Sequence, residues 1–226
     1  MNEKELNEKK KGLIDNLISI GALKTPKIIE AFRKIPRHKF VPENLIDSAY
    51  EDIALPIVKN ATISQPYTVA IMTEALEPKI GEKILEIGTG SGWQACILAY
   101  CVGEKGKVIT MEIDEDVFNF AKRNIEKFGI NNIKLILGDG SAGYEREAPF
   151  DKIIYTAAVP KIPKIILKQL KVGGRIIAPI GSVFEQTMTV IDKISENKFE
   201  EKYLGSFLFV PLKGKFGFKN IKSLTY

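Results

Sequence analysis

Apolar and polar positions in the second half of the chain alternate between two kinds of segment. Short, mostly apolar runs of strand length are separated by longer stretches whose apolar residues recur at helical spacing. Apolar strands joined by crossover helices are typical of an α/β fold with a mostly parallel, doubly wound sheet. The predicted strands cover 83–87, 107–113, 133–137, 151–156 and 174–179, and the predicted helices cover 92–100, 115–128 and 161–170.

Residues 1–80 carry helical periodicity instead, and we predict three helices there. Thr25 followed by Pro26 predicts an N-cap with proline at the first helical position, which opens the second helix through about Ile35. The apolar stripes are Leu6, Leu13, Leu17 and Ile20 in the first helix and Val69, Met72 and Leu76 in the third, which covers 64–76.

Beyond residue 181 the strands recur without a helix between them. Alternating segments at 186–194 and 202–212 flank a polar turn at 195–200, which predicts an antiparallel hairpin. There is no internal repeat or low-complexity linker, so we predict a single domain over 1–226. Its parts are an N-terminal helical region (1–80), an α/β core (81–181) and a C-terminal hairpin and tail (182–226).

Length and composition exclude several protein classes. The chain has 226 residues, of which 45% are hydrophobic and 27% charged, as in ordinary globular domains. It is long enough to bury a core without disulfide or metal support. Its longest apolar runs are far shorter than the roughly 20 residues of a membrane helix, and no apolar signal region follows the charged N-terminus. We therefore expect no membrane partner and a cytoplasmic location.

Charge and rare residue types narrow the classes further. The net charge of +5 comes from 33 basic and 28 acidic residues, and the lysines are scattered along the chain, so we predict no nucleic-acid partner. Cys96 and Cys101 have no histidine or second cysteine pair to complete a metal cage, so we expect buried thiols and no metal site. We expect His38, the only histidine, to be structural.

The strongest local signal is the glycine-rich segment ILEIGTGSGW at 84–93, which follows a predicted strand and opens a predicted helix. Glycines at 88, 90 and 92 let the backbone turn sharply and approach a ligand closely. The G-x-G-x-G spacing differs from the G-x-G-x-x-G of dinucleotide sites, which argues against a nicotinamide-dependent oxidoreductase. A phosphate-binding G-K-[ST] is missing as well.

Acidic residues lie at the ends of two successive predicted strands and just after the third. Glu86 lies at the end of the first strand, Glu112 ends the second, and Asp139 lies in a GDG turn after the third. Glu112 is placed to accept ribose hydroxyls and Asp139 to accept an adenine amino group. Taken singly, Glu112 could be a solvated strand end and Asp139 a turn residue. Their order beside a loop without phosphate-binding residues favours S-adenosylmethionine as the cofactor.

Motifs that the sequence lacks argue against several classes of methyl acceptor. Enzymes that methylate base amino groups typically carry Asn/Asp-Pro-Pro-aromatic after the fourth strand, where this chain reads YTAAVP (155–160). Cytosine carbon methylation needs a cysteine beside proline, and neutral oxygen or carbon acceptors usually need a base or a metal. A carboxylate, with a pKa of about 4, is already ionised at neutral pH and needs only desolvation and alignment.

Longer motifs resemble one family, the protein-L-isoaspartate O-methyltransferases. The resemblance runs collinearly from about residue 30 to residue 214, and TISQP within its third motif is especially specific. The motifs are RKIPRHKFVPE (33–43), AYEDIALPI (49–57), ATISQPYTVAIM (61–72), LEIGTGSGWQAC (85–96), GDGSAGY (138–144), FDKIIYTAAVPKIP (150–163), QLKVGGRIIAPIG (169–181) and FVPLKG (209–214).

The resemblance implies a Rossmann-like methyltransferase sheet with an antiparallel C-terminal strand pair and N-terminal helices. It also implies transfer of a methyl group from S-adenosylmethionine to the α-carboxyl of L-isoaspartyl residues in damaged proteins and peptides. The ester then closes to a succinimide, whose hydrolysis returns some normal aspartate. The family pattern leaves the oligomeric state open.

Site residues follow from the same resemblance. Ser64 matches the family's active-site hydroxyl, and we interpret it as a donor that orients the substrate carboxylate, although Ser64 could instead cap the helix that follows. Trp93 stands where the family often has tyrosine. The implied cofactor residues are Thr62, Ile63, Glu86, Gly88, Gly90, Ser91, Gly92, Glu112, Asp139 and Gly140, and the implied substrate residues are Thr156, Val210, Pro211 and Leu212.

Two other functions stay open on the sequence alone. A methyltransferase of the same fold could act on RNA or on a small molecule, and the basic pI of about 9.0 would suit RNA. A non-enzymatic binding module could also keep this fold. The scattered lysines and TISQP argue against the first function, and the intact glycine loop with its acidic residues argues against the second.

Overall fold

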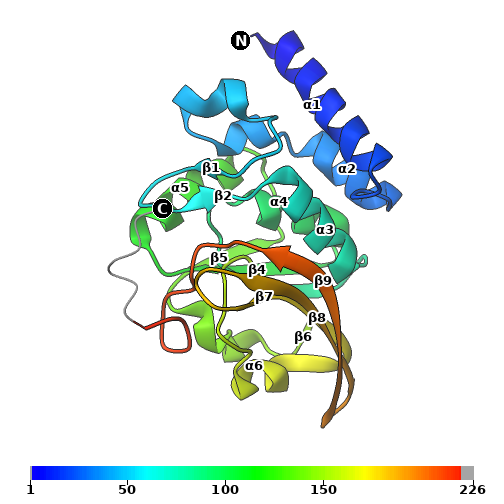
Figure 1. The fold of residues 1–226 in the computed structure, drawn as a ribbon, viewed down its shortest axis with the longest axis vertical. Helices are drawn as coiled ribbons and strands as arrows, with labels where there is room; N and C mark the ends of the chain where they lie inside the picture. Colours follow the sequence, from blue (N-terminus) through cyan, green and yellow to red (C-terminus); the bar gives the residue numbers. More distant parts are fainter. Residues whose placement is uncertain (1, 220–226) are drawn as a thin grey trace.

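A seven-stranded sheet forms the centre of the computed structural model, which describes residues 2–219 (Figure 1). The strand order is β5-β4-β3-β6-β7-β8-β9; neighbours from β5 to β7 are parallel, and β8 and β9 are antiparallel. The predicted doubly wound sheet with an antiparallel C-terminal pair is confirmed. These strands are β3 (Lys83–Ile87), β4 (Lys107–Glu112), β5 (Ile133–Leu137), β6 (Phe150–Tyr155), β7 (Leu170–Gly181), β8 (Gln186–Ser195) and β9 (Lys198–Phe207).

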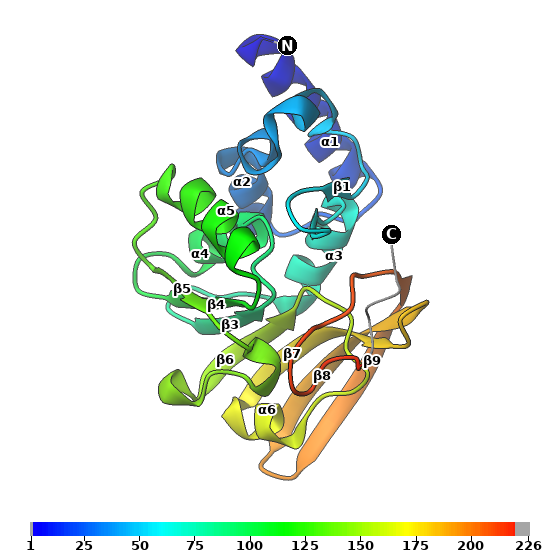
Figure 2. The ribbon, with the colours of Figure 1, turned by 90° about the vertical axis from the view of Figure 1, so that its left-hand side faces the viewer.

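Helices cover both faces of the sheet (Figures 1 and 2). Successive strand residues point to opposite faces, so Ile84 packs with α3 and α4 while Leu85 packs on the other side with Ile166 of α6. The helices are α1 (Glu3–Ser19), α2 (Pro26–Lys34), α3 (Pro66–Leu76), α4 (Trp93–Val102), α5 (Glu115–Glu126) and α6 (Lys164–Gln169). Within residues 2–219, no helix is both long and apolar enough to cross a membrane.

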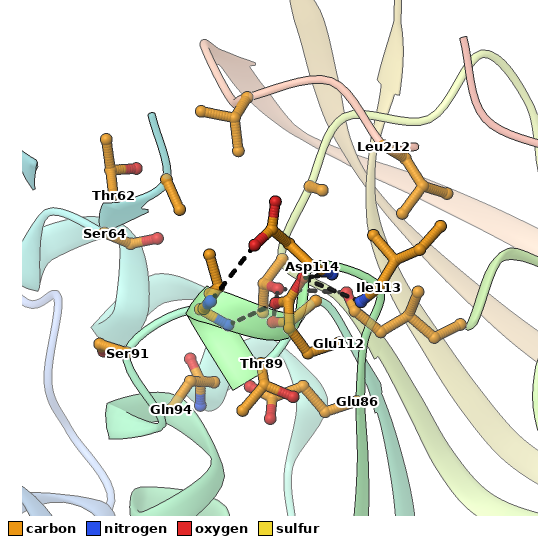
Figure 3. A pocket seen from close by; sticks show the side chains of 18 of the residues that line it. Thr62, Ser64, Glu86, Thr89, Ser91, Gln94, Glu112, Ile113, Asp114 and Leu212 are labelled. Carbon is orange, nitrogen blue, oxygen red and sulfur yellow. Dashed lines mark hydrogen bonds between the residues drawn. The ribbon is translucent and has the colours of Figure 1, made fainter. Parts of the chain in front are cut away.

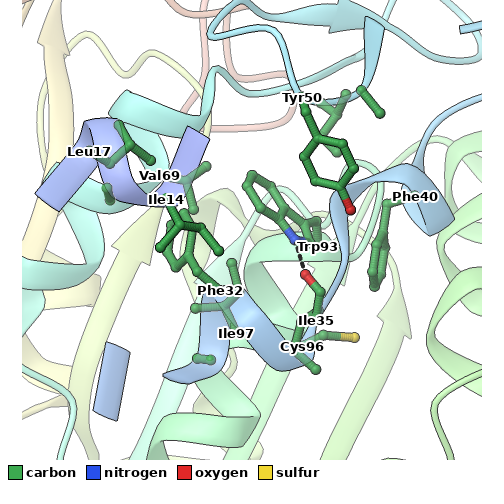
Figure 4. Packing of buried hydrophobic residues seen from close by; sticks show 14 of the residues in the cluster. Ile14, Leu17, Phe32, Ile35, Phe40, Tyr50, Val69, Trp93, Cys96 and Ile97 are labelled. Atoms are coloured by element: carbon green, nitrogen blue, oxygen red, sulfur yellow. Dashed lines mark hydrogen bonds between the residues drawn. The ribbon is translucent and has the colours of Figure 1, made fainter. Parts of the chain in front are cut away.

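The N-terminal helices pack on the helix that follows the glycine loop (Figure 4). Trp93 at the start of α4 lies 5.4 Å edge-to-face from Phe32 of α2, and its indole N–H donates to the carbonyl of Ile35 at 3.0 Å. Leu17 of α1 is fully buried in the same cluster. The N-terminal region therefore supports the glycine loop from behind.

The N-terminal region differs from the prediction in three details. Thr25 precedes α2 as expected, but its hydroxyl donates to Glu74 at 2.7 Å and does not cap the helix. Ile20 is 55% exposed because α1 ends at Ser19, and Ile14 takes a core position instead. A short hairpin of β1 (Leu55–Pro56) and β2 (Thr62–Ile63) also lies in the region predicted to be mostly helical.

The C-terminal hairpin is shifted relative to the prediction of a strand over 202–212. Strand β9 begins earlier, at Lys198, and ends at Phe207; just beyond its end, the amide of Phe209 donates to the Gln186 side chain at 2.7 Å. Residues 208–212 instead cross back to the end of β6, where Ala158 exchanges hydrogen bonds with Val210 and Leu212 at 2.9 and 2.8 Å. Residues 220–226 of the predicted tail lie outside the described residues.

Candidate active site

A cavity of about 370 Å³ lies at the carboxyl ends of β3, β4 and β6. The strand order reverses here, because the chain runs outward from β3 to β5 and returns to β6 on the other side of β3. The glycine loop and the end of β4 line one part of the cavity, here called the cofactor wall, and the β2 end and residues 210–213 line the rest, here called the acceptor wall. Figure 3 shows Thr62 and Ser64 of the β2 end across the cavity from Glu112 and Ile113. Every predicted site residue lines this cavity except Gly92 and Asp139.

The glycine loop needs its glycines for two different reasons. Gly88 has a φ of 98°, and a Cβ there would lie 2.6 Å from the hydroxyl oxygen of Thr156, closer than atoms can approach. Gly92 has a φ of 86° and is the N-cap of α4, where a Cβ would lie 2.9 Å from Ile125 of α5. Gly88 thus lets the loop pass close to Thr156, whereas Gly92 lets α4 pack closely on α5.

Glu112 at the end of β4 is oriented by the backbone around it. One carboxylate oxygen accepts the amide of Gly90 at 3.1 Å, and the other accepts the amides of Ile113 and Asp114 at 2.9 and 3.1 Å. Burial nevertheless raises the pKa of Glu112, while these amides act in the opposite direction. The carboxylate is therefore held rigidly at the cavity wall, where a ligand hydroxyl can donate to it.

Glu86 on β3 is fully buried, and only one of its oxygens is satisfied. Its Oε2 accepts the hydroxyl of Thr110 at 2.5 Å, whereas Oε1 has no partner among the described residues. Burial raises the pKa of Glu86 to about 8; the Thr110 hydroxyl lowers it and Glu112 raises it. A buried polar atom without a partner is costly, and because Glu86 lines the cavity, a cationic group of a ligand could supply that partner.

The turn after β5 places its two predicted residues differently. Gly140 lines the cavity, but Asp139 accepts the amides of Ser141 and Lys215, both at 2.8 Å, outside the cavity lining. Asp139 thereby ties this turn to the C-terminal segment. Its assignment to the adenine end stays a prediction.

Ser64 lies at the end of β2, on the wall opposite the carboxylates (Figure 3). Its hydroxyl has no hydrogen-bond partner among the described residues, whereas its carbonyl accepts the Arg37 guanidinium at 3.1 Å. Gln65, not Ser64, is the N-cap residue of α3, so a helix-capping role does not explain the serine. Thr62 and Ile63 precede it along the same wall.

The remaining predicted substrate residues meet at the end of β6. The Thr156 hydroxyl contacts the carbonyls of Ile87 and Gly88, so its hydrogen is engaged with the backbone. Residues 210–212 are held beside it by Ala158. Thr156 thus joins the acceptor wall to the glycine loop.

The comparisons with known proteins agree with this geometry. The family model for Protein-L-isoaspartate(D-aspartate) O-methyltransferase matches residues 7–217. Protein-L-isoaspartate O-methyltransferases from Methanopyrus kandleri and Pyrococcus horikoshii are 40% and 43% identical, over 98% and 97% of this chain and 98% and 99% of theirs. This chain belongs to the protein-L-isoaspartate(D-aspartate) O-methyltransferase family.

Solved structures of similar proteins extend the match to the fold. A protein-L-isoaspartate O-methyltransferase structure superimposes with a TM-score of 0.84 at 32% identity, covering 92% of this chain and 67% of that one. A Plasmodium falciparum protein assigned to the same activity, in complex with S-adenosyl-L-homocysteine, gives a TM-score of 0.79 at 26% identity, covering 90% and 97%. The predicted family and fold are confirmed.

S-adenosylmethionine is the methyl donor of this family, and the cavity fits it. The unpartnered Glu86 oxygen suits the donor's ammonium group, and Glu112 can accept a hydroxyl. At Gly88 there is no room for a side chain, so only backbone lines the cavity at that position. Among residues 2–219, no three histidine, cysteine, aspartate or glutamate residues are grouped to hold a metal ion. The residue-by-residue roles within the cofactor site stay predictions.

Several lining residues of this family member were missed by the sequence reasoning. Lys59 lies in the β1–β2 turn and pairs with Asp116 of α5 at 3.1 Å, and Lys213 approaches Asp114 to 3.8 Å. Single lysines in loops carry no spacing signal. Gln94 also lines the cavity; it lies one helical position beyond the glycine motif, and that position could have indicated it.

Proposed function

We propose that this chain transfers the methyl group of S-adenosylmethionine to the α-carboxyl of L-isoaspartyl residues in damaged proteins and peptides. The ester then closes to a succinimide that can return to aspartate. One observation carries the proposal: the unpartnered Ser64 hydroxyl shares a single cavity with the glycine loop and Glu112. An orienting donor thus faces the cofactor residues.

Methyl transfer to a carboxylate needs few functional groups on the acceptor wall. The bound cofactor supplies a methyl group on a positively charged sulfur; a carboxylate oxygen forms the new O–C bond while the C–S bond breaks and sulfur keeps the electron pair. The acceptor is ionised at neutral pH, so no residue has to remove a proton. Ser64 donates to one carboxylate oxygen and leaves the other aligned for the displacement.

Water must be kept from the acceptor carboxylate, and the walls do this. Ile63 is buried, Leu212 is 7% exposed, and both line the cavity. A carboxylate that loses its hydration shell becomes a better nucleophile when fixed donors replace the water. The apolar surroundings and the single hydroxyl are consistent with this role.

The test is methyl transfer from labelled S-adenosylmethionine to two peptides that differ only in carrying isoaspartate or aspartate. Base-labile label on the isoaspartyl peptide alone is the expected result. Equal labelling of both peptides, or label that survives base, would contradict carboxyl methylation at isoaspartate. Label on RNA but on neither peptide would establish the RNA methyltransferase alternative.

Two further statements stay predictions of ours. The cytoplasmic location and the lack of a nucleic-acid partner are supported by composition and by scattered lysines. The oligomeric state is open. Sedimentation of the purified protein with and without RNA at low and high salt would measure both RNA binding and oligomeric state.

A further inference from the structure

Arg37 is a buried cation directly behind the Ser64 wall. It lies in the short 3-10 turn Arg37–Phe40 and is 1% exposed. Its guanidinium donates to backbone carbonyls from two separate segments. On one segment the acceptors are Ala49 at 2.7 Å, Glu51 at 3.4 Å and Ile53 at 2.8 Å, and on the other they are Ile63 at 3.5 Å and Ser64 at 3.1 Å.

This environment is unusual for a buried arginine. Buried charges are normally paired with an opposite charge, yet among residues 2–219 Arg37 forms no salt bridge, and Asp52 acts on its charge without a direct ion pair. Its Nε also has no partner there. Burial lowers the pKa of Arg37 to about 10, against the opposing effect of Asp52, so the group stays charged at neutral pH. The role of this side chain is therefore to be sought in the carbonyls that it binds.

The contacts show what Arg37 holds in place. Residues 49–53 precede the β1–β2 hairpin, and residues 63–64 lie at its end. The planar guanidinium fork therefore joins the segment that enters the hairpin to the segment that leaves it. Asp52 completes the anchor because its carboxylate accepts the amide of Tyr67 at 2.8 Å at the start of α3. Ser64 is thereby fixed through its carbonyl while its hydroxyl stays free.

The guanidinium also reaches the other wall. It lies 5.5 Å from the centre of the Trp93 ring, and Trp93 both begins α4 after the glycine loop and lines the cavity. Arg37 therefore contacts the acceptor wall by hydrogen bonds and the cofactor wall only by ring contact. Loss of the fork should act mainly on the acceptor wall.

We propose that Arg37 is a positioning residue for methyl transfer, whose guanidinium fork fixes the Ser64 carbonyl and so aims the Ser64 hydroxyl into the cavity. The inference rests on the proposed function. Lysine would keep the charge, but its single ammonium cannot span carbonyls on two segments. The identity of the side chain, and not only its charge, should therefore matter.

The test is a double-mutant cycle of Arg37→Lys with Ser64→Ala, assayed on the isoaspartyl peptide at saturating S-adenosylmethionine. Arg37→Lys should lower kcat/KM about 10- to 100-fold in the wild-type background but less than about threefold in the Ser64→Ala background. Binding of S-adenosylhomocysteine should change by less than about threefold. Arg33→Lys, an exposed change on α2, is the matched control and should leave both unchanged.

Other results would overturn the proposal. Equal losses in both backgrounds, or a parallel loss of S-adenosylhomocysteine binding, would show that Arg37 supports the fold as a whole. Full activity of Arg37→Lys would show that the fork is not needed. If Arg37→Lys does not fold, Arg37→Gln, which keeps an N–H donor, is measured in the same cycle, and failure of both to fold would assign Arg37 to stability alone. If the wild type and Arg33→Lys methylate neither peptide, the proposed function itself fails.

Discussion

The two walls of the cavity are built in different ways. The cofactor wall consists of strand ends and the start of a helix, and its polar groups are set by regular backbone: Glu112 is held by three amides next to it in space. The acceptor wall, the β2 end and residues 210–213, belongs to two segments with little regular structure, the β1–β2 hairpin and residues 208–213. Buried polar side chains, Arg37 and Gln186, hold those segments in place. Backbone amides thus fix one half of the site, whereas the other half relies on single long side chains in addition to its backbone hydrogen bonds.

This contrast predicts that a substitution in one wall leaves binding at the other wall unchanged. The largest effect should come from Gly88→Ala. The added Cβ would meet the Thr156 hydroxyl at 2.6 Å in a backbone conformation that favours glycine. Affinity for S-adenosylhomocysteine, measured by calorimetry, should fall at least about 100-fold, close to 2.7 kcal/mol. Gly12→Ala, where nothing lies within 4 Å of the added atom, is the control. Unchanged affinity would place the cofactor elsewhere.

A smaller effect, confined to the acceptor wall, is expected for Gln186→Ala. Its side chain accepts the Phe209 amide and donates to the Ser182 carbonyl, so its loss should loosen the chain at Phe209, next to the lining residues 210–212 that Ala158 still holds. The KM for the isoaspartyl peptide should rise about tenfold while cofactor affinity is kept. Gln169→Ala is a matched buried control, because Gln169 holds Ala142 and Tyr144 instead. Equal effects of both variants on KM would contradict the division between walls.

A third effect is a pH-dependent change in stability caused by Glu86, which lines the cavity. In the folded state the pKa of Glu86 is about 8 rather than 4.5, so between these values the folded protein keeps a proton that the unfolded chain has released. Stability is therefore lost as pH rises from about 5 to about 8. Glu86→Gln removes this titration and should exceed the wild type in Tm by about 5 °C or more at pH 8.5, with a smaller difference at pH 5.

The same melting experiment contains its control. Glu104→Gln, on an exposed loop, should follow the wild type at both pH values. A difference between Glu86→Gln and the wild type that does not depend on pH would show that Glu86 is not a buried acid with a raised pKa.

The smallest effect is expected at Lys59. It lines the cavity, but its ion pair with Asp116 is exposed on both sides, and exposed pairs contribute little. Lys59→Gln should change S-adenosylhomocysteine affinity by no more than about twofold at physiological salt. A loss above about tenfold would show that the β1–β2 turn belongs to the cofactor wall.

The contrast between the walls also explains what the sequence could predict. Strands β3 and β5 have the predicted bounds, and the other core elements lie near theirs, because periodicity and glycine spacing are local signals. The exception is β7, which begins at Leu170, inside the predicted helix 161–170, and not at 174. The β1–β2 hairpin and the end of β9 at Phe207 depend on contacts with Arg37 and Gln186, which lie 12 or more residues away from most of their partners. Such long-range contacts leave no periodic trace in the sequence.

The residues of the candidate site also differ in how far the sequence predicts them. Ser64 and residues 210–212 were found through the family resemblance, since no spacing rule relates them to the glycine loop. Arg37 lies within the motif RKIPRHKFVPE, but nothing in that motif says that its side chain is buried against the backbone of Ser64. The role that we propose for Arg37 rests on the backbone carbonyls that surround its guanidinium.

The most direct test of the account is Ser64→Ala, measured for both binding and turnover, with Ser19→Ala on the outside of α1 as the control. The account predicts that S-adenosylhomocysteine affinity stays within about twofold while kcat on the isoaspartyl peptide falls at least about 100-fold. Turnover within about threefold of the wild type, or a parallel loss of cofactor affinity, would contradict the claim that Ser64 acts on the acceptor alone.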